Sequence, residues 1–137
     1  ELSMNIFDKI FGRLGNKQKT EPNSVFKKLP TIEEFPQLNS KNRMGVIMFI
    51  GDSGKLEYFP FLKYAIRSDT DLNVKFAALK RIHLFKDHPE TIQMLTDLKN
   101  DGLGQTYEPY FSMALSRLGV ISIEEFENTI NRQHERK

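Results

Sequence analysis

The 137-residue chain contains no cysteine, so it has no disulfide bond and no thiolate chemistry. This composition fits the reducing cytosol, and we expect a cytoplasmic protein. No apolar run approaches the roughly 20 residues that span a bilayer, so we expect no integral membrane association. The chain also has no large excess of charge of either sign, because it has 20 basic and 18 acidic residues, for a net charge of +2. Nucleic-acid binders concentrate a strong basic excess on one face, and we therefore expect no nucleic-acid partner.

Sequence motifs for common catalytic chemistry are missing as well. The chain has no glycine-rich phosphate loop, no GxGxxG fingerprint and no GxSxG nucleophile elbow. Its three histidines, His83, His88 and His134, fall on different predicted elements without the spacing of a metal site. The acidic pairs at 33–34 and 124–125 lie in first helical turns, where negative charge suits the helix dipole. We therefore expect no enzyme activity, no metal and no cofactor.

Helix signals dominate the chain, and no stretch alternates apolar and polar residues as a strand does. Two Ser/Thr-x-x-Glu capping boxes, at 31–34 and 122–125, each open a helix. Ser40, Asp71 and Thr106 are the expected N-caps of three others. The sequence thus predicts an all-α fold, with helices over residues 32–38, 41–50, 56–67, 72–86, 89–99, 107–118 and 123–133.

The N-terminal region divides into three segments before the helical domain at 25–137. Residues 1–3 precede Met4 and are expected to be a cloning remnant. Residues 4–14 form an amphipathic helix, and the polar segment 15–24 is a flexible linker. The helix has three interpretations: a cap on the fold, a docking element for a partner, or a weak peripheral membrane contact. Its apolar stripe consists of Ile6, Phe7, Ile10, Phe11 and Leu14.

Two segments align as copies of one helix-turn-helix unit. The residues 78–82 (ALKRI) match residues 114–118 (ALSRL) at an offset of 36 (114 − 78). A weaker copy upstream places Arg43 over Lys75, an offset of 32 (75 − 43). Periods in this range indicate a helical solenoid, in which each unit buries its apolar face against a neighbour.

This pattern resembles the HEAT-repeat family, particularly the short bacterial HEAT-like repeats. The resemblance covers about residues 40–119 and implies a short right-handed α-α superhelix of about two and a half to three helix pairs. It also implies that Lys75 pairs with Asp69 or Asp71 in a structural role. The matching residues are Phe61, Leu62, Asp69, Asp71, Val74, Lys75, Ala78, Leu79 and Ile82 in one unit, and Leu95, Leu98, Ala114, Leu118 and Gly119 in the next.

The second helix of each unit lines the concave face in HEAT-like proteins. Phe76 and Lys80 are predicted to be exposed on the second helix of their unit, and His83 lies on the same exposed arc. The offset of 32 gives Met44 and Met48 as the equivalent positions upstream, and the offset of 36 gives Ser112 and Ser116 downstream. Exposed methionine and phenylalanine favour a partner, because methionine adapts to irregular surfaces. In the alternative, the first repeat is rotated and its methionines are core residues. The predicted partner-binding ridge is Met44, Met48, Phe76, Lys80, His83, Ser112 and Ser116.

We therefore expect a non-catalytic bacterial adaptor or inhibitor that binds another protein on its concave face. One alternative is an immunity protein that neutralises a cognate toxin, and an acidic concave face would favour blocking a basic toxin. A second alternative is an accessory subunit resembling the HEAT-like phycobilin lyases, which a deep pocket rich in Asp, Tyr and Arg would favour. Both alternatives depend on analogy at the level of the fold.

Overall fold

The computed structural model describes residues 29–135. The expected remnant at 1–3, the amphipathic helix at 4–14 and the linker at 15–24 lie outside these residues. Between residues 29 and 135 there are six α-helices and no strand, which confirms the expected all-α class. None of the helices in this range has the length and apolar composition to cross a membrane.

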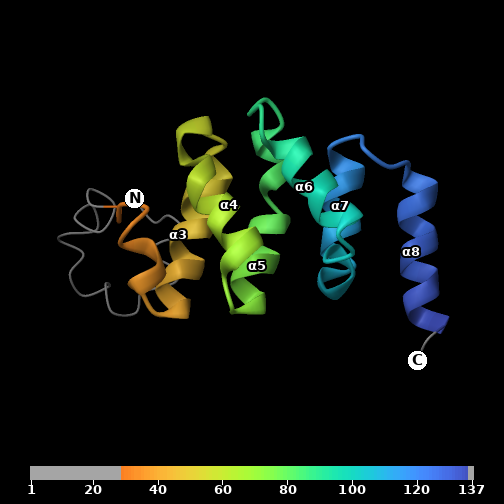
Figure 1. Ribbon diagram of the computed structural model, residues 1–137, viewed down its shortest axis with the longest axis horizontal. Coiled ribbons are helices and arrows are strands. Elements are labelled where there is room, and N and C mark those ends of the chain that lie inside the picture. Colours follow the sequence, from red (N-terminus) through yellow and green to blue (C-terminus); the bar gives the residue numbers. More distant parts are fainter. Residues whose placement is uncertain (1–28, 136–137) are drawn as a thin grey trace, which may run out of the picture.

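The helices follow one another in chain order along the longest axis of the molecule, with α3 at one end and α8 at the other (Figure 1). Helix α5 packs against α3, α4 and α7. The α-helices are α3 (Ser40–Ser53), α4 (Phe59–Ser68), α5 (Leu72–Leu79), α6 (Thr91–Asn100), α7 (Tyr110–Arg117) and α8 (Ile123–Glu135). The 3₁₀ turns are η2 (Phe35–Gln37), η3 (Leu56–Tyr58), η4 (Ile82–Phe85) and η5 (Gly104–Tyr107).

Three predicted caps are present. The Thr31 hydroxyl accepts the Glu34 N–H at 3.1 Å while the Glu34 carboxylate accepts the Thr31 N–H at 3.0 Å, which forms a reciprocal capping box before η2. The Asp71 carboxylate caps α5 by accepting the Asn73 N–H at 2.8 Å. The Ser122 hydroxyl accepts the Glu125 N–H at 3.0 Å at the start of α8. These side chains satisfy backbone donors that a helix start leaves unpaired.

Two other predicted caps are wrong. Asn39, and not Ser40, caps α3 by accepting the Asn42 N–H at 2.8 Å. Thr106 lies inside η5, and its hydroxyl donates to the Leu103 carbonyl at 3.0 Å. Helix α7 begins later than expected, at Tyr110. At α3, a neighbouring residue with an equally suitable side-chain oxygen is the cap. At Thr106, a 3₁₀ turn lies where the sequence pattern predicts the start of the helix.

The predicted helix 72–86 is two elements, because α5 ends at Leu79 and a 3₁₀ turn begins at Ile82. Arginines bind the carbonyls at the break. Arg81 Nη1 donates to the Ala77 carbonyl at 2.9 Å, and Arg117 Nη1 donates to the Lys80 carbonyl at 3.1 Å. The tighter turn leaves both Ile82 and Phe85 of η4 fully buried in the core.

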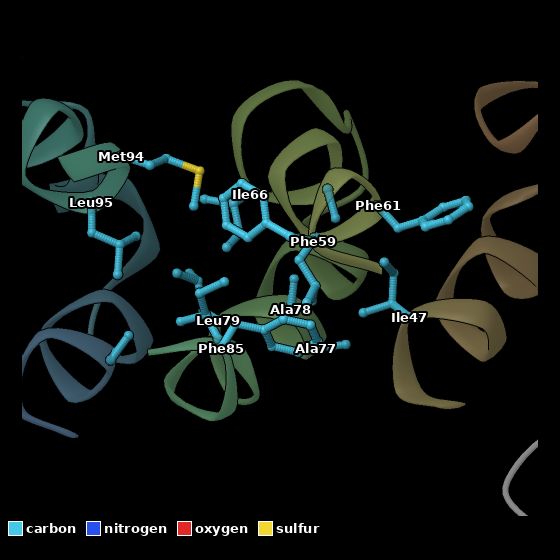
Figure 2. Close-up of a cluster of buried hydrophobic side chains, with 14 of the residues drawn as sticks. Ile47, Phe59, Phe61, Ile66, Ala77, Ala78, Leu79, Phe85, Met94 and Leu95 are labelled. Carbon is cyan, nitrogen blue, oxygen red and sulfur yellow. The ribbon is translucent and has the colours of Figure 1, made fainter. Parts of the chain in front are cut away.

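Apolar side chains from consecutive helices form one continuous core (Figure 2). At one end of the core, the fully buried Phe35 of η2 makes edge-to-face contacts with Phe61 and Tyr64 of α4, at centroid distances of 5.5 and 5.7 Å. Each such pair adds about 0.5–1.5 kcal/mol beyond area burial. In the centre, the fully buried Ala78 offers the small side chain that lets α5 approach its neighbours closely.

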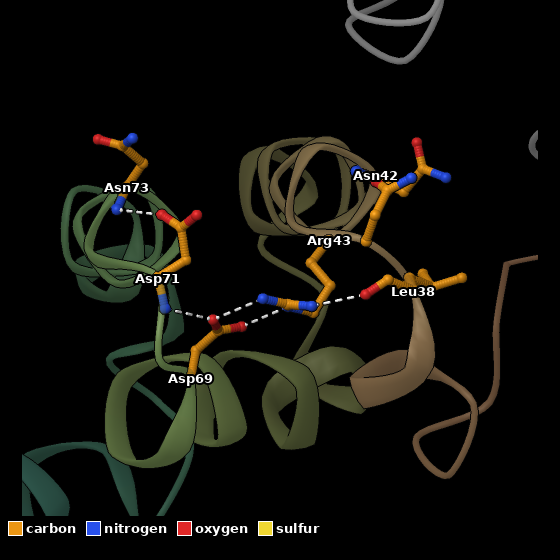
Figure 3. Close-up of polar contacts among 7 residues, drawn as sticks. Leu38, Asn42, Arg43, Asp69, Asp71 and Asn73 are labelled. Atoms are coloured by element: carbon orange, nitrogen blue, oxygen red, sulfur yellow. Dashed lines mark hydrogen bonds and ion pairs between the residues drawn. The ribbon is translucent and has the colours of Figure 1, made fainter.

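An arginine of α3 is tied to the turn that follows α4 (Figure 3). Arg43 donates from Nε and Nη2 to the two carboxylate oxygens of Asp69, at 2.8 and 3.0 Å, and from Nη1 to the Leu38 carbonyl. The Asp69 side chain is only 1% exposed and also accepts the Asp71 N–H at 2.9 Å. The hydrogen bond to Asp69 raises the pKa of Arg43. The contact is a buried, bidentate ion pair that joins two segments 26 residues apart.

The predicted pairing of Lys75 with Asp69 or Asp71 is wrong. Lys75 is 7% exposed, and its ammonium donates to the Ile66 carbonyl near the end of α4 at 3.0 Å. The same ammonium lies 4.9 Å from the centroid of the Tyr107 ring. Asp69 pairs instead with Arg43, whose planar fork matches a carboxylate with two parallel bonds, whereas lysine is a point charge that a helix-end carbonyl satisfies.

Candidate protein-binding groove

An open groove of about 370 Å³ lies where the C-terminal ends of α3, α5 and α7 meet. One carboxylate comes from the end of α3, and a cluster of residues comes from the segment that follows α5. The remaining two residues come from α7. The lining residues are Asp52, Lys80, Arg81, His83, Leu84, Met113 and Arg117.

Arg81 connects the segment after α5 to the end of α3. Its Nε lies 2.9 Å from the Asp52 carboxylate, and the two side chains are 17% and 44% exposed. Gly51 makes room for this crossing, because a Cβ at that position would lie 2.7 Å from Arg81 Cδ. A pair this exposed contributes at most about 1 kcal/mol to folding. Its main effect is to orient the guanidinium along one wall of the groove.

Two further cations, Lys80 and Arg117, line the groove. Arg117 of α7 donates to the Lys80 carbonyl at 3.1 Å. The Lys80 ammonium lies 4.9 Å from the centroid of the Tyr110 ring, and that ring packs on Phe76 with the centroids 4.6 Å apart. Among the residues that the structure describes, neither Lys80 nor Arg117 has a carboxylate within 4.0 Å. Their charges are therefore positioned but not neutralised.

His83 is half-buried at the edge of this cluster, and its Nδ1 is buried without a hydrogen-bond partner in the described part of the chain. Burial and the positive charge of Arg117 lower the pKa of His83 below its ordinary value of 6.5. The ring is therefore neutral at pH 7, and the groove carries three cations and one carboxylate. Within residues 29–135 no three His, Asp or Glu side chains gather to hold a metal ion.

The structure brings together only part of the predicted ridge. Lys80 and His83 line the groove, and Phe76 adjoins it through Tyr110. The remaining members, apart from Ser112, are half-buried. They are Met44 and Met48, which pack against the core from α3, and Ser116 of α7.

Ser112 is the clear error in the predicted ridge, because it is buried and does not face a partner. It is 5% exposed, its hydroxyl donates to the Glu108 carboxylate at 2.6 Å, and its N–H donates to the same carboxylate at 2.9 Å. The two bonds cap the start of α7, so Ser112 is structural.

Sequence reasoning missed five of the seven lining residues, namely Asp52, Arg81, Leu84, Met113 and Arg117. A signal for two of them was present. Arg81 and Arg117 occupy the same position of the repeat, 36 residues apart, each two residues after the leucine of the aligned Ala-Leu pair. A pair of arginines at equivalent positions of stacked units would lie close in space, which places positive charge at one edge of both units.

The described residues thus form an all-α protein with an open cationic groove at the ends of three helices. Comparison of the chain with known protein families, curated proteins and solved structures finds no match.

Proposed function

We propose that the chain is a non-catalytic protein-binding module, a bacterial adaptor or inhibitor, that binds another protein with its groove. We further propose that it is a short right-handed HEAT-like superhelix of about two and a half to three helix pairs. In this arrangement α3, α5 and α7 are the second helices of successive units. The observation that carries the proposal is the open groove where these three helices end together.

Equivalent contacts in successive units support the stacked arrangement. Helix α5 packs against α3 on one side and against α7 on the other. Arg81 reaches back to Asp52 at the end of α3, and Arg117 reaches back to the Lys80 carbonyl after α5. Each arginine, at the same repeat position, contacts the end of the preceding second helix. A repeated contact of this kind is what stacking of similar units produces.

The chemistry of the groove supports a protein as the ligand. Leu84 is 44% exposed on the groove wall, beside unpaired cations and the half-buried Met113. Exposed apolar groups next to arginine are typical of protein interfaces, where arginine and methionine are enriched. An open groove admits a segment of a partner from solvent without any rearrangement of the helices.

The geometry weighs against one form of each alternative function. An immunity protein that blocks a basic toxin needs an acidic surface, whereas this groove carries a positive charge. A lyase of the phycobilin type needs a deep pocket for its cofactor-like substrate, whereas this groove is open and holds no tyrosine in its lining. An adaptor or inhibitor that binds its partner in the groove is consistent with both the positive charge and the open shape of the groove.

Site-specific photo-crosslinking tests the proposal. A benzoylphenylalanine replaces Leu84 in the groove, and in a matched control it replaces Leu72 at the start of α5. The two leucines are 44% and 48% exposed, so the probes have similar access to solvent. Irradiation in the native cytoplasm should give a discrete crosslinked protein from position 84 and not from position 72. The same products from both positions, or none from position 84, would contradict the proposal.

A further inference from the structure

We propose that the groove recognises an acidic segment of the partner protein, in which one or two carboxylates lie next to an apolar side chain. This inference rests on the proposed protein-binding function and names the chemistry of the partner.

The groove is a local concentration of positive charge. Its lining holds Lys80, Arg81 and Arg117 against the single carboxylate of Asp52, which gives a net charge of +2. The described residues 29–135 hold 12 Lys and Arg against 15 Asp and Glu, a net charge of −3 (12 − 15), so the groove is a cationic site on an otherwise acidic part of the chain. A charge excess located in one hollow attracts a ligand of opposite sign and sets the register in which it binds.

The two unpaired cations are held in place before any ligand arrives. Arg117 is fixed by its bond to the Lys80 carbonyl, and the Lys80 ammonium is held over the Tyr110 ring. An arginine has five N–H donors, and only one of those in Arg117 is used in this bond. The others remain for a carboxylate, which accepts two parallel bonds from a guanidinium. Prior positioning lowers the entropy lost on binding.

The apolar part of the groove and its size favour a peptide over a nucleic acid. Leu84 and Met113 offer contacts to an aliphatic or aromatic side chain next to the cations. A hollow of about 370 Å³ lies at the small end of the range for binding pockets, which suits a few side chains. Single-stranded nucleic acids are bound along extended basic grooves with aromatic platforms for successive bases. The lining of this groove holds no aromatic side chain besides His83.

Selection from a random dodecapeptide phage library tests this inference with the full chain. The test variant K80Q/R117Q removes two groove cations. The control variant K41Q/R67Q removes two exposed cations elsewhere, Lys41 in the first turn of α3 and Arg67 in the last turn of α4. Lys41 precedes Asp52 by eleven residues, which is about 16 Å along a helix. The two variants therefore match in net charge and differ in the site.

Peptides enriched on the wild-type chain should carry net negative charge and at least one large apolar residue. Their affinity should fall at least about tenfold in K80Q/R117Q and stay within about twofold in K41Q/R67Q. Enrichment of neutral or basic peptides would overturn the inference, and so would equal binding by both variants. Tighter binding of a single-stranded DNA oligonucleotide than of any peptide, lost in K80Q/R117Q, would overturn it in favour of a nucleic acid.

The outcome also separates this inference from the function on which it rests. If crosslinking at position 84 succeeds but the selected peptides are not acidic, the partner chemistry is wrong and the protein-binding function stands. If no peptide is enriched and no protein is crosslinked at position 84, both fail.

Discussion

Replacement of Arg43 by methionine should destabilise the fold far more than the same replacement of Arg81. Both arginines bond an aspartate on a neighbouring segment and a backbone carbonyl. They differ in burial. The Asp69 side chain beside Arg43 is 1% exposed, whereas the Asp52 side chain beside Arg81 is 44% exposed. Methionine keeps the apolar stem of arginine, so the comparison isolates the charge and its hydrogen bonds.

The expected costs follow from the fate of each aspartate. Loss of one partner of a buried ion pair costs about 3–5 kcal/mol, because a charge is left uncompensated away from water. Asp69 keeps the N–H bond from Asp71, which places Arg43→Met near the lower end, at about 3 kcal/mol. In Arg81→Met the exposed Asp52 is hydrated by water, so the cost is about 1 kcal/mol.

Urea unfolding followed by far-UV circular dichroism measures the difference. With a slope of about 2 kcal/mol per molar urea, the midpoint should fall by about 1.5 M in Arg43→Met and about 0.5 M in Arg81→Met. The double variant Arg43→Met with Asp69→Asn should cost less than the sum of the single changes by more than about 1 kcal/mol. Equal midpoints for the two arginine variants, or additive costs in the cycle, would refute the reasoning.

Three further predictions concern single positions. Gly104→Ala should cost about 1–3 kcal/mol in thermal or urea unfolding, because the added Cβ would lie 2.2 Å from the buried Phe111 ring; an unchanged midpoint would show that the ring has room to move. Lys75→Met should cost about 1–2 kcal/mol, since the Ile66 carbonyl loses its buried donor, and a gain in stability would contradict this. The lowered pKa of His83 means that the unfolded chain takes up a proton at higher pH than the folded chain, so stability falls as the pH drops below 6.5. Between about pH 7.5 and about pH 5.5 the free energy of unfolding should therefore fall more in the wild type than in His83→Gln, and equal falls would contradict the assignment.

Helix starts were predictable from the sequence where contacts between residues a few positions apart determine them. The capping boxes at Thr31 and Ser122 and the cap at Asp71 form as expected, because each partner lies two or three residues away. The end of α5 at Leu79 was not predictable. The carbonyl of Lys80 is taken by Arg117, 37 residues further on, and no local pattern announces such a contact.

The candidate site was only partly predictable, because it is assembled from the ends of different helices. Lys80 and His83 were found from helical periodicity, which identifies exposed positions on one helix. Ser112 was wrongly predicted to be exposed, because the repeat offset identifies equivalent positions but does not say whether they are buried. Its hydroxyl donates a hydrogen bond to Glu108, four residues earlier. Likewise, Asp69 was assigned to the nearby Lys75, whereas Arg43 from the preceding helix bonds it with two nitrogens.

Hydrogen–deuterium exchange of the chain bound to the protein that crosslinks at position 84 tests the central claim most directly. In the proposed complex, the partner lies over the groove where α3, α5 and α7 end. Peptides that cover residues 80–86 and 113–119 should therefore exchange more slowly in the complex, while those that cover α4 and α6 should be unchanged. Slower exchange confined to α4 and α6, with none around Lys80 and Arg117, would contradict the claim.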